Sequence, residues 1–159
     1  MKKVLICCFL TLFTSSLLVA QGNAVSENTG TSWEQDFSKA KSLAKKTNKP
    51  ILVFFTGSDW CGPCKMLNAD IFEAEEFKNL SENEFVLYEA DFPRNRNLVS
   101  KSQQNDNVVL IDKYGINSYP TIVIINEKGK EFGRMKGYNL MRDTSYHYSF
   151  FEDTLKKIK

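Results

Sequence analysis

Apolar residues are arranged along the chain in two ways. Some are spaced as on one face of a helix, and others form runs typical of strands. The first helical pattern has apolar positions spaced by four, three and four residues, at Trp33, Phe37, Ala40 and Ala44. This spacing predicts an amphipathic helix with one buried face. Thr31 or Ser32 would cap its start. Glu34 or Gln35 would complete the capping box, and the helix would end near Pro50.

Three apolar runs lack the helical spacing and predict strands. The run 51–55 is continuous and rich in β-favouring residues, as in a strand buried on both faces of a sheet. Similar runs cover 85–91 and 121–125. A turn-forming segment, 126–130, joins the last of them to a fourth strand at 131–135, which predicts a hairpin.

Helix-forming segments separate these strands. We expect helices over 65–72 and 73–80, a short helix over 108–114 that Gly115 ends, and a final helix over 140–158. The order is helix, strand, helix, strand, helix, strand, strand, helix. That order predicts an α/β domain with a parallel part and a terminal antiparallel hairpin.

The N-terminus carries a targeting pattern. Two lysines precede an apolar stretch that ends at Ala20, which predicts a secretory signal peptide over residues 1–20. A flexible polar leader would follow over 21–31, and the folded domain would cover 32–159. The domain would therefore be exported, and the chain would meet a membrane only through its N-terminal signal. An uncleaved signal that anchors the domain outside the cytoplasm is the alternative.

Composition narrows the possible functions. The chain has 159 residues, of which 42% are hydrophobic and 25% charged, values that exclude a wholly disordered chain and fit one domain. It has 21 basic and 19 acidic residues, so loss of Lys2 and Lys3 with the signal leaves equal numbers. This balance excludes a general nucleic-acid-binding surface.

The four cysteines form two pairs. Cys7 and Cys8 lie in the predicted signal, which leaves Cys61 and Cys64 for the exported domain. Their spacing permits a structural disulfide, a metal site or dithiol redox chemistry. A bridge that closes so few residues stabilises a fold weakly. A zinc site lacks further ligands, because His147 is the single histidine and lies far downstream, so we expect no metal.

The predicted position of Cys61 at the start of a helix favours redox chemistry. A helix N-terminus has unpaired N–H groups and partial positive charge, which stabilise a thiolate. A free thiol with a pKa of about 8.5 is only about 3% ionised at pH 7, so a lower pKa makes Cys61 a better nucleophile. Cys64, one turn later, would be the resolving thiol.

Two separated motifs resemble the thioredoxin family. Trp60-Cys61-Gly62-Pro63-Cys64-Lys65 follows a buried strand, and Tyr114-Gly115-Ile116 is followed by Tyr119-Pro120-Thr121. The resemblance covers about residues 32–158. It implies a thioredoxin fold, with a central mixed sheet flanked by helices and a helical N-terminal extension.

By this resemblance, Cys61 attacks a substrate disulfide and Cys64 then displaces the product, which leaves the Cys61–Cys64 disulfide as the redox-active group and requires no further cofactor. Gly62-Pro63 resembles the dipeptide of reducing thioredoxins. Segments 56–59 and 91–93 resemble a secreted bacterial subgroup, the DsbH-like disulfide reductases. The implied partners are disulfide-bonded exported proteins, in the periplasm, and a membrane electron donor.

The same resemblance implies residues that shape the site. The Tyr119–Pro120 bond would be cis and would set the backbone of Tyr119 beside the sulfurs, where it pairs with an extended substrate. Trp60 would border the site, and Gly137 would let a substrate chain approach. The alternatives are an ordinary trans turn, a core tryptophan and a simple turn glycine.

Two features depart from the family pattern. Thioredoxins carry a buried acid in the strand before the cysteines, where this chain has Phe54 and Phe55. Glu89 and Asp91 could substitute for it, but solvent-facing carboxylates are the favoured interpretation. The polar segment 93–107 is a second departure, which we interpret as a solvated loop rather than a partner-selecting insertion.

Two other functions remain open from the sequence. The same dithiol could form or reshuffle disulfides, as an oxidase or isomerase does. A binding or holdase module could instead capture unfolded chains in a groove around Trp60 and Tyr119, with the cysteines incidental.

Overall fold

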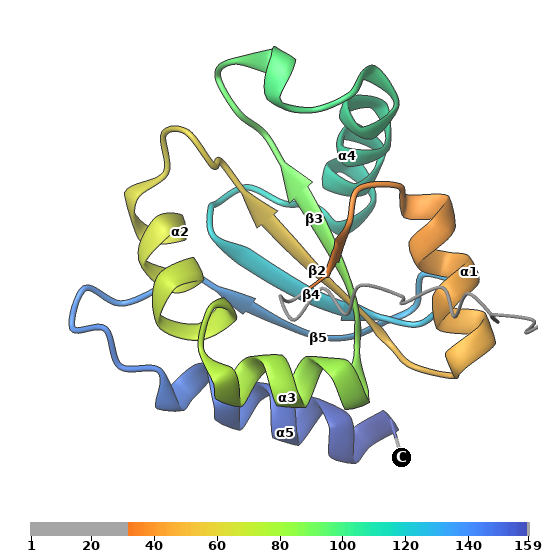
Figure 1. Ribbon diagram of the computed structural model, residues 1–159, viewed down its shortest axis with the longest axis vertical. Coiled ribbons are helices and arrows are strands. Elements are labelled where there is room, and N and C mark those ends of the chain that lie inside the picture. The colour runs from red at the N-terminus through yellow and green to blue at the C-terminus, as the bar shows by residue number, and fades with distance from the viewer. Residues whose placement is uncertain (1–31, 159) are drawn as a thin grey trace, which may run out of the picture.

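A five-stranded mixed sheet forms the centre of the fold in the computed structural model, which describes residues 32–158 (Figure 1). The strands lie in the order β1-β3-β2-β4-β5. β3 is parallel to β1 and β2, whereas β4 is antiparallel to β2 and β5. The α/β class and the mixed sheet are confirmed. The strand bounds are β1 Trp33–Glu34, β2 Ile51–Thr56, β3 Val86–Asp91, β4 Thr121–Ile125 and β5 Glu131–Lys136.

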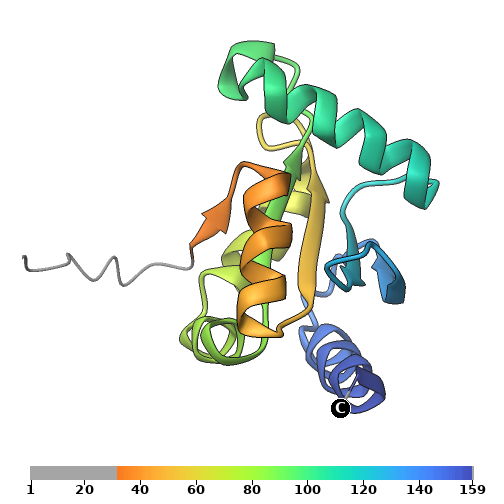
Figure 2. The same cartoon turned by 90° about the vertical axis from the view of Figure 1, so that its right-hand side faces the viewer.

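Helices cover both faces of the sheet, which makes three layers (Figures 1 and 2). In Figure 1, α2 lies at the left end of the sheet, α4 lies at the top, and α3 and α5 run along the bottom. A π-helical turn, Asn68–Phe72, extends α2, and a 3-10 turn, Arg96–Leu98, precedes α4. The helix bounds are α1 Phe37–Thr47, α2 Gly62–Leu67, α3 Glu75–Glu84, α4 Lys101–Tyr114 and α5 Ser145–Ile158.

The central strand β2 is buried on both faces, as its continuous apolar run predicts. Alternate side chains of a strand point to opposite faces. One set packs with α1 and α4 in a largely aliphatic cluster that includes Ile51, Val53, Ala40, Ala44 and Leu110. The other set packs with α2, α3 and α5 in an aromatic-rich cluster that includes Phe54, Phe72, Phe77, Phe151 and both site cysteines.

The first helix begins later than the apolar spacing predicts. Its cap is Asp36, whose carboxylate accepts from the Lys39 amide at 2.9 Å. The segment before it is extended, because Trp33 pairs in parallel with Leu87 at the edge of the sheet. Trp33 also packs its ring against Phe72, with centroids 5.0 Å apart. The prediction that the helix starts at about residue 32 was therefore wrong. Pairing in the sheet and packing against Phe72 place Trp33 in an extended segment instead of on the helix face.

The polar segment 93–107 is not a long solvated loop. Its second half forms the start of α4, capped by Ser100, whose hydroxyl accepts from the Gln103 amide at 3.1 Å. Gln103 and Asn107 lie on the buried face of α4, where they donate to the backbone carbonyls of Glu89 and Asp91. The sequence shows no apolar periodicity over this part of the helix, because two of its buried positions carry side-chain amides, Gln103 and Asn107, that bond to the end of β3.

The final helix also starts later than predicted, at Ser145, and a hydrogen-bonded turn occupies 139–142. Within residues 32–158, no helix is both long and apolar enough to cross a membrane. The predicted signal peptide and leader, with Cys7 and Cys8, lie outside the described residues.

Candidate functional site

The site cysteines lie where β2 turns into α2. Cys61 is the N-cap residue of α2, with Gly62 and Pro63 in the first turn, as the sequence predicts. Cys61 and Cys64 form a disulfide, and the Cys64 amide lies 3.2 Å from the Cys61 sulfur, to which it donates. The exposed fractions are 4% for Cys61 and 1% for Cys64. Both cysteines are thus buried, and Cys61 is the slightly more exposed of the two.

Trp60 borders the disulfide on the outer surface. Its indole Nε1 donates to the carbonyl of Phe92 at 2.8 Å, and its ring meets Tyr119 edge-on with centroids 5.6 Å apart. Gly57 must be a glycine here, because a Cβ on it would lie 2.3 Å from the indole. Trp60 remains 38% exposed, so it is a surface residue of the site rather than a core residue.

The segment before β4 and the segment after β5 meet beside Trp60. The Tyr119–Pro120 bond is cis. The Gly137 amide donates to the Pro120 carbonyl at 2.8 Å, which joins the two segments. Gly137 has a φ of +77°, a conformation that favours glycine, and a Cβ there would meet nothing within 4 Å. The backbone at Gly137 is therefore open to an approaching chain.

Asp59 fixes the loop on the β3 side of the site. Its carboxylate accepts from the amides of Arg94 and Asn95, both at 2.9 Å. These two backbone hydrogen bonds lower the pKa of Asp59 below its usual value. The Arg94 guanidinium lies over the Trp60 ring, 5.7 Å from its centroid.

Asp70 fixes the turn on the other side of the site. It lies in the π-helical turn after α2, where Arg142 and Tyr138 both donate to its carboxylate, the Tyr138 hydroxyl at 2.7 Å. The hydrogen bond from Arg142, followed by that from Tyr138, lowers the pKa of Asp70 to about 2. Asp70 thus stays ionised and joins the helix of the cysteines to the segment after β5.

Glu89 lies on the same face of the sheet as α2 and is only partly exposed, so the interpretation of a solvent-facing carboxylate holds for it only in part. It pairs with Phe54 across β3 and β2, on the face that carries α2. It shares a cavity of about 320 Å³ with Cys64, whose other lining residues are Phe54, Thr56, Ser58, Lys65, Asn68 and Glu73. Burial, followed by the nearby charge of Asp91, raises the pKa of Glu89 to about 7.

Asp91 is buried, which corrects the interpretation of a solvent-facing carboxylate for this residue. Only 6% of it is exposed, and its two oxygens accept from the amide and the hydroxyl of Ser58, at 2.8 and 2.6 Å. Asp91 therefore holds the turn between β2 and Cys61. Both of its oxygens are engaged by Ser58, whereas Glu89 lines the cavity that Cys64 also lines.

Comparison with known proteins defines the family. A sequence model of the thioredoxin-like domain matches residues 37–144. The chain belongs to the thioredoxin-like domain family. It is 35% identical over 103 residues to the disulfide bond reductase DsbH of Chlamydia pneumoniae, covering 65% of this chain and 61% of that protein. It is 30% identical over 144 residues to the thioredoxin-related protein DsbJ of the same organism, covering 87% of this chain and 40% of that protein.

Among solved structures, a DsbH oxidoreductase superposes with a TM-score of 0.69 at 30% identity, covering 80% of this chain and 85% of that one. The chain is thus a DsbH-like member of the thioredoxin fold. It spans less than two thirds of the length of the two curated relatives.

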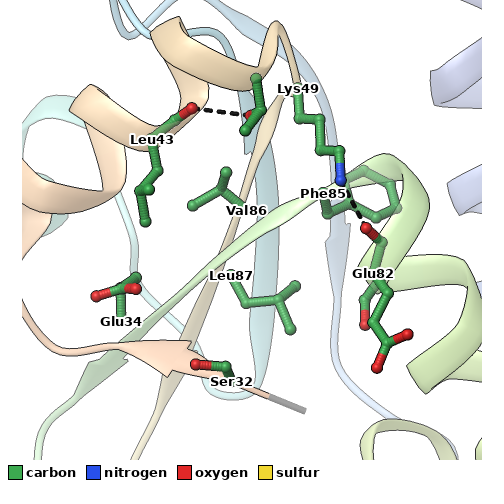
Figure 3. Close-up of a pocket in the computed structure, with 10 residues that line it drawn as sticks. Ser32, Glu34, Leu43, Lys49, Glu82, Phe85, Val86 and Leu87 are labelled. Carbon is green, nitrogen blue, oxygen red and sulfur yellow. Dashed lines mark hydrogen bonds between the residues drawn. The ribbon is translucent and has the colours of Figure 1, made fainter. Parts of the chain in front are cut away.

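Another hollow of about 220 Å³ lies between α1, the strands β1 and β3, and the end of α3 (Figure 3). Its wall is mainly apolar, with Leu43, Val86 and Leu87 facing it, and Lys49 donates to the Glu82 carbonyl at its rim. No cysteine or histidine lines it. Within residues 32–158, no group of three or more histidine, cysteine or acidic residues could hold a metal ion.

The sequence analysis placed both cysteines, Trp60 and Pro120 together, and the structure brings them to one end of the sheet. The sequence analysis did not identify Asp59 and Asp70, whose carboxylates hold the loops on the two sides of the site. Asp59 stands directly before the cysteine motif, but its partner amides come from a loop more than thirty residues later. The side of the sheet on which Glu89 lies could have been inferred, because alternate residues of the predicted strand 85–91 share a face and Glu89 therefore shares one with Leu87.

Proposed function

We propose that this protein is an exported thiol–disulfide oxidoreductase that reduces protein disulfides through Cys61 and Cys64. The observation that carries the proposal is the bonded cysteine pair at the N-cap of α2, with Cys61 outermost. The similarity to a protein named disulfide bond reductase supports the reducing direction. Gly62-Pro63 supports the same direction by resemblance.

The reaction begins with the reduced pair. The Cys61 thiolate attacks one sulfur of a substrate disulfide, and the second substrate sulfur leaves as a thiolate that takes up a proton. The Cys61–substrate disulfide is then attacked by Cys64, which loses its proton as it reacts. The products are the Cys61–Cys64 disulfide and a second substrate thiol, so two electrons pass to the substrate. The structure corresponds to this oxidised end of the cycle.

The second step requires a group that takes the proton of Cys64. Cys64 is nearly fully buried, so bulk water reaches it poorly. Glu89 shares its cavity, and with a pKa of about 7 it can accept a proton at neutral pH and release it again. We assign this role to Glu89, which replaces the acid missing from β2.

Residues around the disulfide would bind the substrate chain. By the family resemblance, the backbone of Tyr119 pairs with an extended substrate beside Pro120, and Gly137 leaves room for it. Trp60 supplies apolar contact area at the rim. The reaction needs no cofactor beyond the cysteine pair.

The proposed location is the periplasm, reached by the signal over residues 1–20. An uncleaved signal would leave the domain on the same side of the membrane. The substrates would be disulfide-bonded exported proteins. A membrane protein would supply the electrons that return the Cys61–Cys64 disulfide to two thiols.

Reduction of insulin, with the equilibrium potential against glutathione, tests this proposal. The wild-type protein should reduce insulin, and Cys61→Ser should not. A reductant should have a potential near that of thioredoxin, about −270 mV, whereas a value near −120 mV would contradict the reducing direction. Refolding of a scrambled multi-disulfide protein by the wild type would indicate an isomerase. Full activity of a Cys61→Ser/Cys64→Ser double variant in preventing aggregation would favour the holdase.

A further inference from the structure

A hydrogen-bonded turn with two exposed apolar side chains follows β5. The Arg142 amide donates to the Asn139 carbonyl at 3.1 Å, and the Asp143 amide donates to the Asn139 side chain at 3.2 Å. Between them, Leu140 is 79% exposed and Met141 is 91% exposed. These two residues lie at the tip of the turn and project almost entirely into solvent.

The turn is held in place by polar contacts rather than by its apolar residues. Arg142 adopts a φ of +57°, which is uncommon for a residue with a side chain, and its guanidinium pairs with Asp70. Tyr138 donates to the same carboxylate. A turn fixed in this way does not need leucine or methionine for its own stability. Exposed apolar groups on a fixed support are typical of an interaction surface.

The turn is linked at two points to elements that carry the disulfide site. Gly137, which precedes it, is bonded to Pro120, and Asp70, which anchors it, belongs to the helical segment that continues from Cys64. Figure 1 shows this segment, between β5 and α5, at the left end of the molecule beside α2. The surface from Pro120 to the turn is open at Gly137, where a Cβ would meet nothing within 4 Å. A chain bound at the disulfide can therefore continue over the turn.

We propose that Leu140 and Met141 bind apolar side chains of the polypeptide substrate, on one side of the disulfide that Cys61 attacks. This inference rests on the proposed function and adds a substrate class to it: protein disulfides with apolar flanking residues. The continuity of the turn with the Pro120 segment and with the helix of the cysteines favours a substrate chain over other occupants. The charge of Arg142 is already paired with Asp70, so the tip of the turn offers apolar contact.

Two synthetic peptides test the proposal. Both carry a cysteine in a mixed disulfide with glutathione, one flanked by leucine and phenylalanine and the other by serines. The ratio of kcat/KM for the apolar peptide to that for the polar peptide should be about tenfold for the wild-type protein, equivalent to about 1.4 kcal/mol. In Leu140→Ser/Met141→Ser the ratio should fall to near one. Met141→Ser alone should give an intermediate ratio, and circular dichroism checks that each variant is folded.

The matched control is Val108→Ser/Val109→Ser on α4, where the two valines are 54% and 63% exposed. This variant also replaces two adjacent exposed apolar residues by serine and should keep the wild-type ratio. An unchanged ratio in the Leu140→Ser/Met141→Ser variant overturns the inference, as does an equal loss in the α4 control.

The remaining outcomes separate this inference from the proposed function. A wild-type protein that reduces neither peptide contradicts the proposed function itself. A wild-type protein that reduces both peptides equally well contradicts the inference alone. Two further outcomes would overturn the inference if the peptide ratio did not depend on Leu140 and Met141. Binding to anionic lipid vesicles through these two residues would assign the turn to a membrane, and dimer formation through them in sedimentation would assign it to a second copy of the chain.

Discussion

The acidic residues at the rim of the site and the acidic residue behind it have opposite electrostatic environments. Asp59 and Asp70 lie at the outer surface, where hydrogen bonds from amides, Arg142 and Tyr138 lower their pKa values. Glu89 lies in the cavity behind Cys64, where burial raises its pKa to about 7. The same functional group is thus held as a permanent charge in one region and is poised to titrate in the other.

This difference separates two tasks. A carboxylate that stays ionised is suited to fixing a loop, because its acceptors remain available at every physiological pH. A carboxyl group with a pKa near neutrality is suited to proton exchange, because both of its forms are populated. Substitutions at these three positions should therefore affect different steps of the reaction.

The largest effect is expected from Glu89→Gln, which keeps the shape and removes the titrating group. The attack of Cys64 on the mixed disulfide should slow by about 100-fold at pH 8, in the range typical for loss of a general base. In the wild-type protein this rate should rise with pH through about 7, as Glu89 loses its proton, and the rise should vanish in the variant. Single-turnover stopped-flow kinetics measures this step.

Glu73→Gln is the matched control, because Glu73 lines the same cavity and is itself exposed. It should leave the rate of this step and its pH dependence close to wild type. An equal loss in both variants would mean that the cavity as a whole, rather than Glu89, governs the proton transfer.

Glu89 should also make the stability of the wild-type protein pH-dependent. The folded protein holds its proton up to about pH 7, whereas the unfolded chain releases it near 4.5. The free energy of unfolding should therefore fall as pH rises between these values. Glu89→Gln should be more stable than wild type at pH 8, by at most about 3 kcal/mol, and equal to it near pH 4. Urea titrations at both pH values measure the difference, and parallel pH profiles would contradict the assignment.

A smaller effect is expected at the rim from Asp70→Asn. The amide keeps an acceptor for Tyr138 but loses the charge that holds Arg142, so the turn of Leu140 and Met141 becomes less ordered. The preference for the apolar peptide should fall about threefold, the cost of ordering one or two side chains on binding. In the wild-type protein the anchor should persist from pH 8 to pH 4 and be lost as pH falls through about 2. A variant that keeps the full preference would show that the turn is ordered without Asp70.

The smallest effect is expected from Asp59→Asn. The amide oxygen replaces one acceptor, but its NH2 group cannot accept from the second backbone amide, so the loop of Arg94 and Asn95 is less tightly held. We expect trypsin to cleave after Arg94 about twice as fast, with a similarly small loss in insulin reduction. Trypsin cleavage at the wild-type rate would mean that the loop is held by its other contacts, such as Trp60 on Phe92.

The part of the site that lies close together in sequence could be predicted from the sequence. The apolar run of β2 indicated a strand buried on both faces, and Pro63 with the following helix formers placed Cys61 at a helix start. Both signals are local, because they depend on propensity and on the few residues around them.

The parts that could not be predicted depend on contacts distant in sequence. Trp33 is part of a strand rather than of the predicted helix, because it pairs with Leu87 in the sheet and packs its ring against Phe72. The second half of α4 was predicted as the helix over 108–114, but its first half was missed because Gln103 and Asn107 are buried through hydrogen bonds to the end of β3. A polar side chain is interpreted as exposed unless its partner is known, and in α4 the partners are backbone carbonyls of another element.

The most direct test of the account uses Cys64→Ser with insulin. Without its resolving thiol, Cys61 should accumulate as a stable mixed disulfide with insulin, identified by mass spectrometry, whereas Cys61→Ser should trap little or none. Absence of the Cys61–insulin disulfide, or trapping through Cys64 in the Cys61→Ser variant at the same rate, would contradict the assignment of Cys61 as the attacking sulfur.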